Sequence, residues 1–346
     1  MKILLVSPLP PPIGGIATWT EKYMKFYSSR QEEVKLVNSA IEGKRVNNVQ
    51  HVRINEELKR AGNLKKKINQ LIKNEKPDVL HYNASCSSKF SLIRDYLILR
   101  SLKVPILYQC HCDLDTVLDN NVSIKMFQLI GKKAKVIGVL NKKSLARAKR
   151  YNPNAALFPN FIDHIENPVT EYSNRVSKVC FVGRAVNTKG IYEYLEAAGM
   201  KKEIEFWIVG SETDQLEKEK IPENVVLTGQ KENKEVIDIL KTMDAYILPS
   251  YSEGFPLGVL EAMSCGIPVI ATNVGAIPDM IENKGGVLLP SPSAENIVEA
   301  IEKIQEKPVR EQMGKFNRTK VETAYEISIV IDKLNGCYCR MIKGGK

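Results

Sequence analysis

Short, mostly apolar segments recur along this chain and alternate with segments of helical periodicity. In the first half they have the length of strands, and the first of them, Ile3–Ser7, has the apolar character that strands show when both faces of their sheet are covered. The predicted strands are Ile3–Ser7, Val34–Val37, Val79–Tyr82, Ile106–Gln109 and Val136–Leu140. The helices predicted between them are Ile16–Tyr27, Ile54–Lys73, Phe90–Leu102 and Lys142–Arg150. Repeated strand–helix units joined by right-handed crossovers build a mostly parallel sheet.

The second half restarts the same pattern after a polar stretch that ends near Ser177. Its predicted strands are Val179–Val182, Phe206–Val209, Val225–Leu227, Ala245–Leu248, Val269–Ala271 and Val287–Leu289. Its predicted helices are Gly190–Ala198, Lys234–Lys241, Leu257–Ser264, Pro278–Glu282, Ala294–Ile304 and a final segment, Arg318–Ile342. A chain of 346 residues suits two domains of ordinary size. We therefore predict an α/β protein with Rossmann-like domains at 1–165 and 166–320, and a C-terminal helix within 321–346.

Charge is divided unevenly between the two halves. Residues 1–165 carry 28 Lys and Arg against 13 Asp and Glu, whereas the whole chain has a net charge of +10. This excess predicts an acidic partner for the first half, such as a phosphorylated or lipid-linked substrate or an anionic membrane. A solvated helix face is an equally good interpretation of the cations. Nucleic acid fits less well, because aromatic residues make up only 7% of the chain and are not interleaved with the cations.

The cysteines and the apolar segments indicate a reducing compartment and no membrane span. The seven cysteines form no Cys-x-x-Cys pair, and their odd number favours reduced thiols. The apolar run Ile3–Val6 is halted by Pro8, and about 18 consecutive apolar residues, the length of a membrane span, occur nowhere. We therefore expect a cytoplasmic protein that is soluble or attached to the inner face of the cell membrane.

Ligands of open α/β sheets bind beyond the carboxyl ends of the strands, so the loops after the strands are the candidate sites. The first such loop is Pro10-Pro-Pro-Ile-Gly14-Gly15-Ile16. Its glycines would let backbone N–H groups approach a phosphate or a sugar at the N-terminus of the next helix. The loop has neither a Gly-x-Gly-x-x-Gly fingerprint nor a Walker sequence, and a plain tight turn explains it equally well.

A second loop, Gly183-Arg184-Ala-Val-Asn-Thr-Lys189-Gly190, follows the Val179–Val182 strand and opens a helix. A pyrophosphate needs two or more cationic donors together with the N–H groups of a helix N-terminus, and this loop can supply both. The simpler interpretation is that Arg184 and Lys189 are solvated surface residues.

A third loop carries two glutamates eight positions apart, in Glu253-Gly254-Phe255-Pro256-Leu257-Gly258-Val-Leu-Glu261. Pro256 suits the first helical turn and Gly266 suits the C-terminal cap, so the N–H groups of Leu257 and Gly258 would face the ligand. Carboxylates accept hydrogen bonds from sugar and ribose hydroxyls. Two glutamates on a solvated helix face are the alternative, but the surrounding residues are almost all apolar.

The fourth candidate is His111, which lies in Gln109-Cys110-His111-Cys112-Asp113 at the end of a predicted strand. A histidine in this position could act on the acceptor or on the transferred sugar, or it could be a structural residue. Cys110, His111 and Cys112 are not expected to share a metal ion, because adjacent residues of an extended chain point to opposite sides.

In combination and in this order, these motifs resemble the retaining glycosyltransferases of the GT-B fold, family 4 (group 1) type. The resemblance covers nearly the whole chain and is strongest over 179–289. It also includes Pro159-Asn160-Phe161-Ile162-Asp163 and Gly275-Ala-Ile-Pro278-Asp279. It implies two Rossmann-like domains with a cleft between them and a C-terminal helix that packs back on the first domain. Asp279 and Phe161 depart from the more usual Glu and Gly, which leaves the sugar specificity open.

The resemblance also implies a role for each candidate residue. Arg184 and Lys189 would bind the donor pyrophosphate, and Glu261 would bind the ribose. Glu253 and the residues that follow it would bind the donor sugar: Gly254, Phe255, Pro256, Leu257 and Gly258. Gly14 and Gly15 would lie near the donor phosphate, and His111 near the reaction centre. No metal or other cofactor is expected, because cationic side chains and helix N-termini neutralise the leaving diphosphate.

The sequence therefore favours transfer of a hexose from a nucleotide diphosphate sugar to an acceptor hydroxyl with retained anomeric configuration. Cell-surface polysaccharide or glycolipid assembly would suit the basic first half. His111, Arg184, Lys189 and Glu253 are the predicted catalytic residues. An epimerase or a phosphorylase of the same fold is the nearest alternative. A Rossmann oxidoreductase would need a Gly-x-Gly-x-x-Gly fingerprint, which this chain lacks. A non-catalytic nucleotide-sugar-binding protein would keep the fold but lose charges of the cleft, whereas the principal charges are all present: Arg184, Lys189, Glu253 and Glu261.

Overall fold

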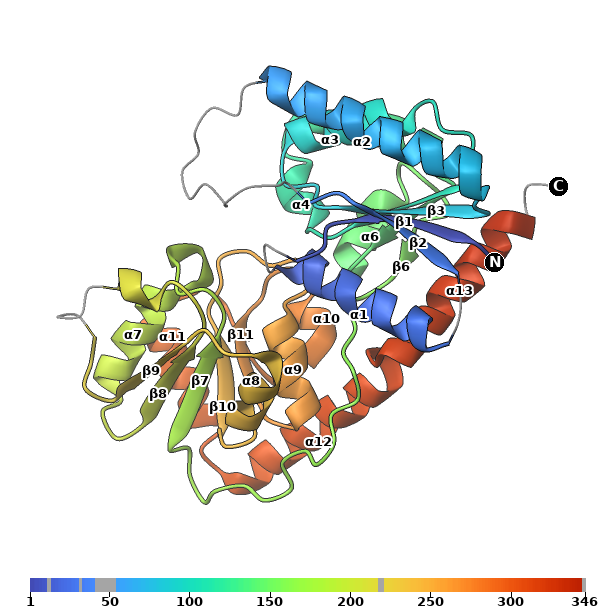
Figure 1. The fold of residues 1–346 in the computed structure, drawn as a ribbon. Helices are drawn as coiled ribbons and strands as arrows, with labels where there is room; N and C mark the ends of the chain where they lie inside the picture. Colours follow the sequence, from blue (N-terminus) through green and yellow to red (C-terminus); the bar gives the residue numbers. More distant parts are fainter. Residues whose placement is uncertain (11–13, 31–32, 41–53, 217–220, 344–346) are drawn as a thin grey trace. The chain divides into compact units, whose positions relative to one another are not determined.

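The computed structural model describes residues 1–10, 14–30, 33–40, 54–216 and 221–343, with the backbone alone for 54–58. The chain forms two compact units (Figure 1). Unit 1 contains Met1–Asn160 and Ile327–Lys346, and unit 2 contains Phe161–Glu326. The divisions therefore lie at 160/161 and 326/327, within six residues of the sequence-based boundaries.

Unit 1 is built on a six-stranded parallel sheet with the order β2-β1-β3-β4-β5-β6. Its strands are β1 (Ile3–Ser7), β2 (Val34–Asn38), β3 (Val79–Ala84), β4 (Ile106–Cys110), β5 (Val136–Val139) and the short β6 (Ala156–Leu157), which the sequence did not predict. Its helices are α1 (Gly15–Ser29), α2 (Ile54–Glu75), α3 (Lys89–Leu99), α4 (Leu114–Val117), α5 (Asn121–Lys133), α6 (Lys142–Ala148) and α13 (Ile327–Lys343). The strand order reverses between β1 and β3, so the loops after these strands lie at the topological switch point where ligands of such sheets bind.

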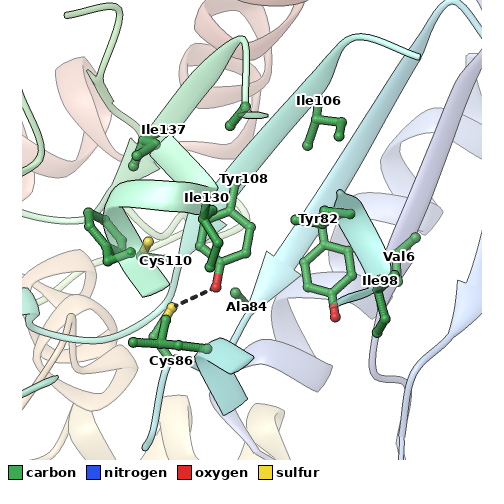
Figure 2. Packing of buried hydrophobic residues seen from close by; sticks show 14 of the residues in the cluster. Val6, Tyr82, Ala84, Cys86, Ile98, Ile106, Tyr108, Cys110, Ile130 and Ile137 are labelled. Atoms are coloured by element: carbon green, nitrogen blue, oxygen red, sulfur yellow. Dashed lines mark hydrogen bonds between the residues drawn. The ribbon is translucent and has the colours of Figure 1, made fainter. Parts of the chain in front are cut away.

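The sheet of unit 1 separates two layers of helices (Figure 1). Successive residues of a strand face opposite sides. On β3, Leu80 and Tyr82 join the apolar cluster beneath α2, α3 and α5, part of which Figure 2 shows. His81 faces the other side, where its Nδ1 lies 2.6 Å from the hydroxyl of Tyr338 on α13. Helix α13 is thus tied to the central strand of unit 1.

The predicted amphipathic helix Ile54–Lys73 is confirmed as α2, although the side chains of 54–58 lie outside the described residues. Ala61 and Ile68 are buried in the core cluster, and Leu64, Leu71 and Ile72 pack against it. The apolar spacing of three and four residues therefore identified the buried face correctly.

Unit 2 repeats the architecture with the strand order β12-β11-β10-β7-β8-β9. Its strands are β7 (Lys178–Val182), β8 (Glu205–Val209), β9 (Val225–Gly229), β10 (Ala245–Leu248), β11 (Val269–Thr272) and β12 (Gly286–Leu289). Its helices are α7 (Ile191–Met200), α8 (Asn233–Leu240), α9 (Leu257–Cys265), α10 (Ile277–Ile281), α11 (Ala294–Lys303) and α12 (Lys307–Ala324). The switch point lies at β7 and β10, which are adjacent and which lead into the two loops that carry the predicted donor residues.

The prediction of one uninterrupted final helix from Arg318 to Ile342 is wrong. The segment contains the end of α12 and all of α13 except its last residue, Lys343, and the helix is interrupted at Tyr325 and Glu326. The N–H of Ile162 donates to the Tyr325 carbonyl at 3.0 Å, and Ile162 forms an isolated bridge with Glu326. This contact takes up a carbonyl that a continuous helix would use internally, and no helical periodicity could reveal it.

Candidate functional site

The loops after β7 and β10 are held against each other at the switch point of unit 2. Gly190 has φ +74°, and a Cβ atom on it would lie 2.0 Å from the carbonyl oxygen of Pro249. The N–H of Tyr251 donates to the carbonyl of Thr188 at 3.1 Å. The second and third loops predicted from the sequence are therefore parts of one site.

Lys189 and Glu253 form the centre of this site. The Lys189 Nζ lies 2.6 Å from Glu253 Oε1, and the side chains are 27% and 7% exposed. The Ser250 hydroxyl donates to the same oxygen at 2.7 Å. A buried carboxylate requires this kind of compensation, because its desolvation is otherwise costly. Both contacts use Oε1, and Oε2 has no hydrogen-bond partner in the described part of the chain.

The loop between β11 and α10 packs against the backbone of Glu253 and Gly254. Gly275 has φ +57°, and a Cβ atom on it would lie 2.1 Å from the carbonyl oxygen of Glu253. The N–H of Ala276 donates to the carbonyl of Gly254 at 2.9 Å, and the Thr272 hydroxyl donates to the carbonyl of Ser250. The glutamate is thus fixed by its backbone as well as by its carboxylate.

Helix α9 begins directly after this loop. Pro256 is its N-cap, one position before the predicted first turn, and Gly266 closes the helix in the left-handed conformation, as predicted. Leu257 and Gly258 in the first turn are half-buried, so this positive end of the helix is accessible. A Cβ atom on Gly258 would lie 2.5 Å from the Tyr246 hydroxyl, so glycine lets the helix seat closely on β10.

The structure places the remaining unit 2 candidates in different surroundings. Arg184 is 47% exposed and lies 3.7 Å from Glu212, so it forms a separate ion pair instead of joining the Lys189–Glu253 pair. Glu261 accepts a hydrogen bond from the Asn233 side chain at 2.6 Å. Phe255 is buried with its ring 5.4 Å from that of Tyr325, so its side chain packs in the interior.

In unit 1, Gly14 and Gly15 begin α1, but residues 11–13 of the predicted loop lie outside the described residues. Gly14 is the N-cap with an extended backbone, and its carbonyl accepts from the N–H of Thr18 at 2.9 Å. A Cβ atom on Gly15 would meet nothing within 4 Å, so the described parts of the protein impose no need for glycine there.

His111 follows β4 and is half-buried. Its Nε2 lies 2.9 Å from the side-chain oxygen of Asn83, and its ring stands edge-on to Trp19 at 5.7 Å. Burial, together with the nearby His81, lowers the pKa of His111 to about 3, so the ring is neutral at physiological pH. The described residues contain no group of three or more His, Cys, Asp or Glu that could hold a metal ion.

Sequence reasoning missed the polar residues that hold the candidates in place: Ser250, Asn233, Asn83 and Ser7. Asn83 lies near the end of β3. This strand pairs in parallel with β4, and β4 leads directly to His111. A polar residue at the carboxyl end of a buried strand was a usable signal, because neighbouring strand ends meet at one edge of the sheet.

Comparison with known proteins identifies unit 2. Residues 167–320 match the family model described as glycosyl transferases group 1. This segment belongs to the group 1 glycosyltransferases. The prediction from the donor motifs is thereby confirmed at the level of the family.

Two curated relatives support this identification. The chain is 34% identical over 131 residues to a putative teichuronic acid biosynthesis glycosyltransferase of Bacillus subtilis, which covers 37% of this chain and 33% of the relative. It is 30% identical over 109 residues to UDP-Gal:alpha-D-GlcNAc-diphosphoundecaprenol alpha-1,3-galactosyltransferase of Escherichia coli, which covers 31% of this chain and 28% of the relative. The matches thus span about a third of these relatives' length.

Solved structures extend the similarity to the whole chain. Sucrose-phosphate synthase of Thermosynechococcus elongatus superposes with a TM-score of 0.80 at 17% identity and covers 99% of both chains. HepE of Anabaena in complex with UDP-glucose gives a TM-score of 0.73 at 14% identity and covers 97% of this chain and 99% of its own. The chain has the GT-B type of fold, as the sequence predicted.

Proposed function

We propose that this protein is a retaining glycosyltransferase that moves a hexose from a nucleotide diphosphate sugar to an acceptor hydroxyl. The observation that carries the proposal is the Lys189–Glu253 pair at the switch point of unit 2, beside the N-terminus of α9. The pair supplies a cation for a phosphate and a carboxylate for a hydroxyl, at the edge of the sheet where ligands of this type of fold bind.

In this proposal the bound donor replaces the partners that Lys189 and Arg184 have within the protein. Lys189 turns from Glu253 towards the diphosphate, and the free oxygen of Glu253, Oε2, accepts a hydrogen bond from a sugar hydroxyl. Arg184, which is half-exposed and lies 3.7 Å from Glu212 in an ion pair, supplies the second cation. The N–H groups of Leu257 and Gly258 complete the anion site.

The chemical work follows from the same contacts. Negative charge develops on the departing diphosphate, and preorganised cations and N–H groups stabilise it more in the transition state than in the ground state. Glu253 is already paired through Oε1, so it suits the binding of a hydroxyl better than attack on the anomeric carbon. We therefore propose a same-face displacement without a covalent enzyme intermediate, and we assign the neutralisation of the diphosphate to side chains and not to a metal ion.

A lipid-linked saccharide is the acceptor we propose, in cell-surface polysaccharide or glycolipid assembly. The name of the Escherichia coli relative specifies a diphosphoundecaprenol-linked acceptor, and that of the Bacillus relative specifies teichuronic acid biosynthesis. These transferase names favour group transfer over the epimerase and phosphorylase alternatives. Formation of a free sugar or a sugar phosphate as the main product would reverse that preference.

Unit 1 supports a peripheral contact with an anionic membrane at the cytoplasmic face. Helix α2 exposes the cations Lys59, Arg60, Lys66, Lys67 and Lys73. On the adjacent α3, Phe90 is 56% exposed. Cations near an anionic surface contribute about 1 kcal/mol each, and an exposed aromatic ring adds apolar contact. No helix among the described residues is long and apolar enough to cross a membrane.

Two experiments test the proposal. A thermal-shift screen of UDP-, GDP- and ADP-sugars should find one donor that raises the unfolding temperature, since ligand at 100 times its Kd adds about 2.7 kcal/mol to stability. The shift should disappear in Lys189→Ala and persist in Lys231→Ala, whose exposed pair with Glu235 lies on the surface of the same unit. In liposome flotation, equal binding to neutral and anionic vesicles would contradict the membrane contact without affecting the donor site.

A further inference from the structure

His111 stands at the end of a continuous chain of hydrogen bonds within unit 1. Its Nε2 contacts Asn83 Oδ1 at 2.9 Å, and the amide nitrogen of Asn83 donates to the Ser7 hydroxyl at 3.0 Å. Ser7 lies 2.5 Å from the Thr20 hydroxyl, which donates to the carbonyl of Ile16 at 2.8 Å. The chain thus runs from the end of β4 through β3 and β1 to the first turn of α1.

The direction of every bond in this chain is fixed by its last member. A carbonyl can only accept, so the Thr20 hydroxyl donates its single proton to the carbonyl of Ile16. The proton between Ser7 and Thr20 must therefore come from Ser7. The Ser7 oxygen then accepts from the amide of Asn83, whose carbonyl oxygen is left to accept from His111. Nε2 carries the proton, and Nδ1 keeps its lone pair.

The reversed orientation of the Asn83 amide fails the same test. With Oδ1 turned towards Ser7, the Ser7 proton would go to Asn83 while the Thr20 proton still goes to Ile16. The Ser7 and Thr20 oxygens would then stand 2.5 Å apart with no proton between them. Ser7 and Thr20 are fully buried and Asn83 is nearly so, so water cannot relieve that contact.

The other strand-end histidine provides a contrast. His81 is fully buried, its Nδ1 pairs with the Tyr338 hydroxyl, and its Nε2 pairs with the side-chain oxygen of Gln109 at 3.0 Å. Both of its nitrogens are used inside the protein, as expected of a structural residue. His111 is half-buried, and within the described part of the chain only its Nε2 has a hydrogen-bond partner.

We infer that Asn83 and Ser7, with Thr20 behind them, are positioning residues that fix the tautomer of His111 and present its Nδ1 as a hydrogen-bond acceptor to a substrate hydroxyl. This inference rests on the proposed function for the identity of the substrate, a hydroxylated sugar. The tautomer itself does not depend on it. The wrong tautomer would present an N–H to the hydroxyl, which can then no longer donate to the ring.

The first test measures the tautomer without any activity assay. A long-range proton–nitrogen NMR spectrum of the full chain separates protonated from unprotonated ring nitrogens. The chain has four histidines, so His111→Gln and His81→Gln suffice to assign the two signals. We expect the His111 proton on Nε2 in the wild type and a mixture of tautomers in Ser7→Ala. A proton on Nδ1 in the wild type would overturn the inference.

The second test measures sugar transfer. Asn83→Leu removes the acceptor and should lower kcat by roughly 10- to 100-fold, with the thermal shift produced by the donor unchanged. Asn83→Gln keeps both the acceptor for Nε2–H and an N–H donor for Ser7, and should retain more of the rate than Asn83→Leu. Should Asn83→Leu fail to fold, Ser7→Ala carries the same comparison. Wild-type kcat in both Asn83→Leu and Ser7→Ala would refute the positioning role, whereas absence of transfer in the wild type would refute only the proposed function.

Discussion

Replacing Lys189 by alanine separates the two roles that the structure gives this residue. The change leaves the Glu253 carboxylate, 7% exposed, with Ser250 as its remaining partner in the described part of the chain. Breaking a buried ion pair costs about 3–5 kcal/mol. Because Lys189 itself is 27% exposed, solvent compensates part of the loss, and we expect about 1–3 kcal/mol less stability.

The same substitution removes a cation from the proposed diphosphate site. Loss of one preorganised group of this kind lowers kcat by about 100- to 1000-fold. The double variant Lys189→Ala/Glu253→Gln tells the two effects apart, because a neutral amide needs no cation. It should regain most of the stability and none of the transfer rate, as measured by denaturant unfolding and by release of nucleoside diphosphate. Lys231→Ala is the matched control and should change stability by less than about 0.5 kcal/mol.

Either of two results would refute this reasoning. Wild-type turnover in Lys189→Ala would remove Lys189 from the diphosphate site. Recovery of transfer in the double variant would mean that the single variant fails only because an unpaired carboxylate disturbs the loop.

Two further predictions concern the supports of the site and its surroundings. Gly275→Ala should lower the free energy of unfolding by more than about 2 kcal/mol and impair donor binding, because its Cβ atom would lie 2.1 Å from the Glu253 carbonyl oxygen. The control is Gly229→Ala, which is also at positive φ but has nothing within 4 Å of its Cβ atom, and which should lose only the backbone strain of about 1–2 kcal/mol. Equal losses of stability for the two variants in denaturant unfolding would disprove the clash. Burial lowers the pKa of His81 to about 3 in the folded state, so the unfolded state binds more protons between about pH 6.5 and pH 3, and stability should fall as pH falls through that window. His81→Gln should flatten this slope, and an unchanged slope in pH-dependent unfolding would contradict the assignment.

The strands and the site loops could be predicted from the sequence because their causes are local. β1 and β10 have the predicted bounds, since a short apolar run between turn residues is sufficient to define a buried strand. Gly266 closes α9 as predicted, because a glycine in the left-handed conformation is the commonest end of a helix.

The contacts that complete the site could not be predicted, because their causes are distant in the sequence. Lys189 and Glu253 are 64 positions apart, and only the adjacency of β7 and β10 brings them together. The assignment of Lys189 to phosphate and of Glu253 to sugar did not include their pairing with each other. Nothing in the sequence around Arg184 indicates that it pairs with Glu212.

The polar residues behind the candidates form a second unpredicted group. Asn83 is a buried polar residue near the end of β3, and its role depends on its hydrogen bonds to Ser7 and to His111. The break at Tyr325 has the same origin, because it depends on a hydrogen bond from Ile162. Such features follow from tertiary contacts and leave no periodicity in the sequence.

Proton NMR of the reaction product is the direct test of retaining transfer at the Lys189–Glu253 site. The donor found by thermal shift is incubated with the protein and a diphospholipid-linked saccharide, and the coupling constant of the new anomeric proton is measured. We predict release of nucleoside diphosphate and a product with the anomeric configuration of the donor. Lys189→Ala should abolish this transfer, and Lys231→Ala should preserve its rate. An inverted product, or the same rate in Lys189→Ala, would contradict this prediction.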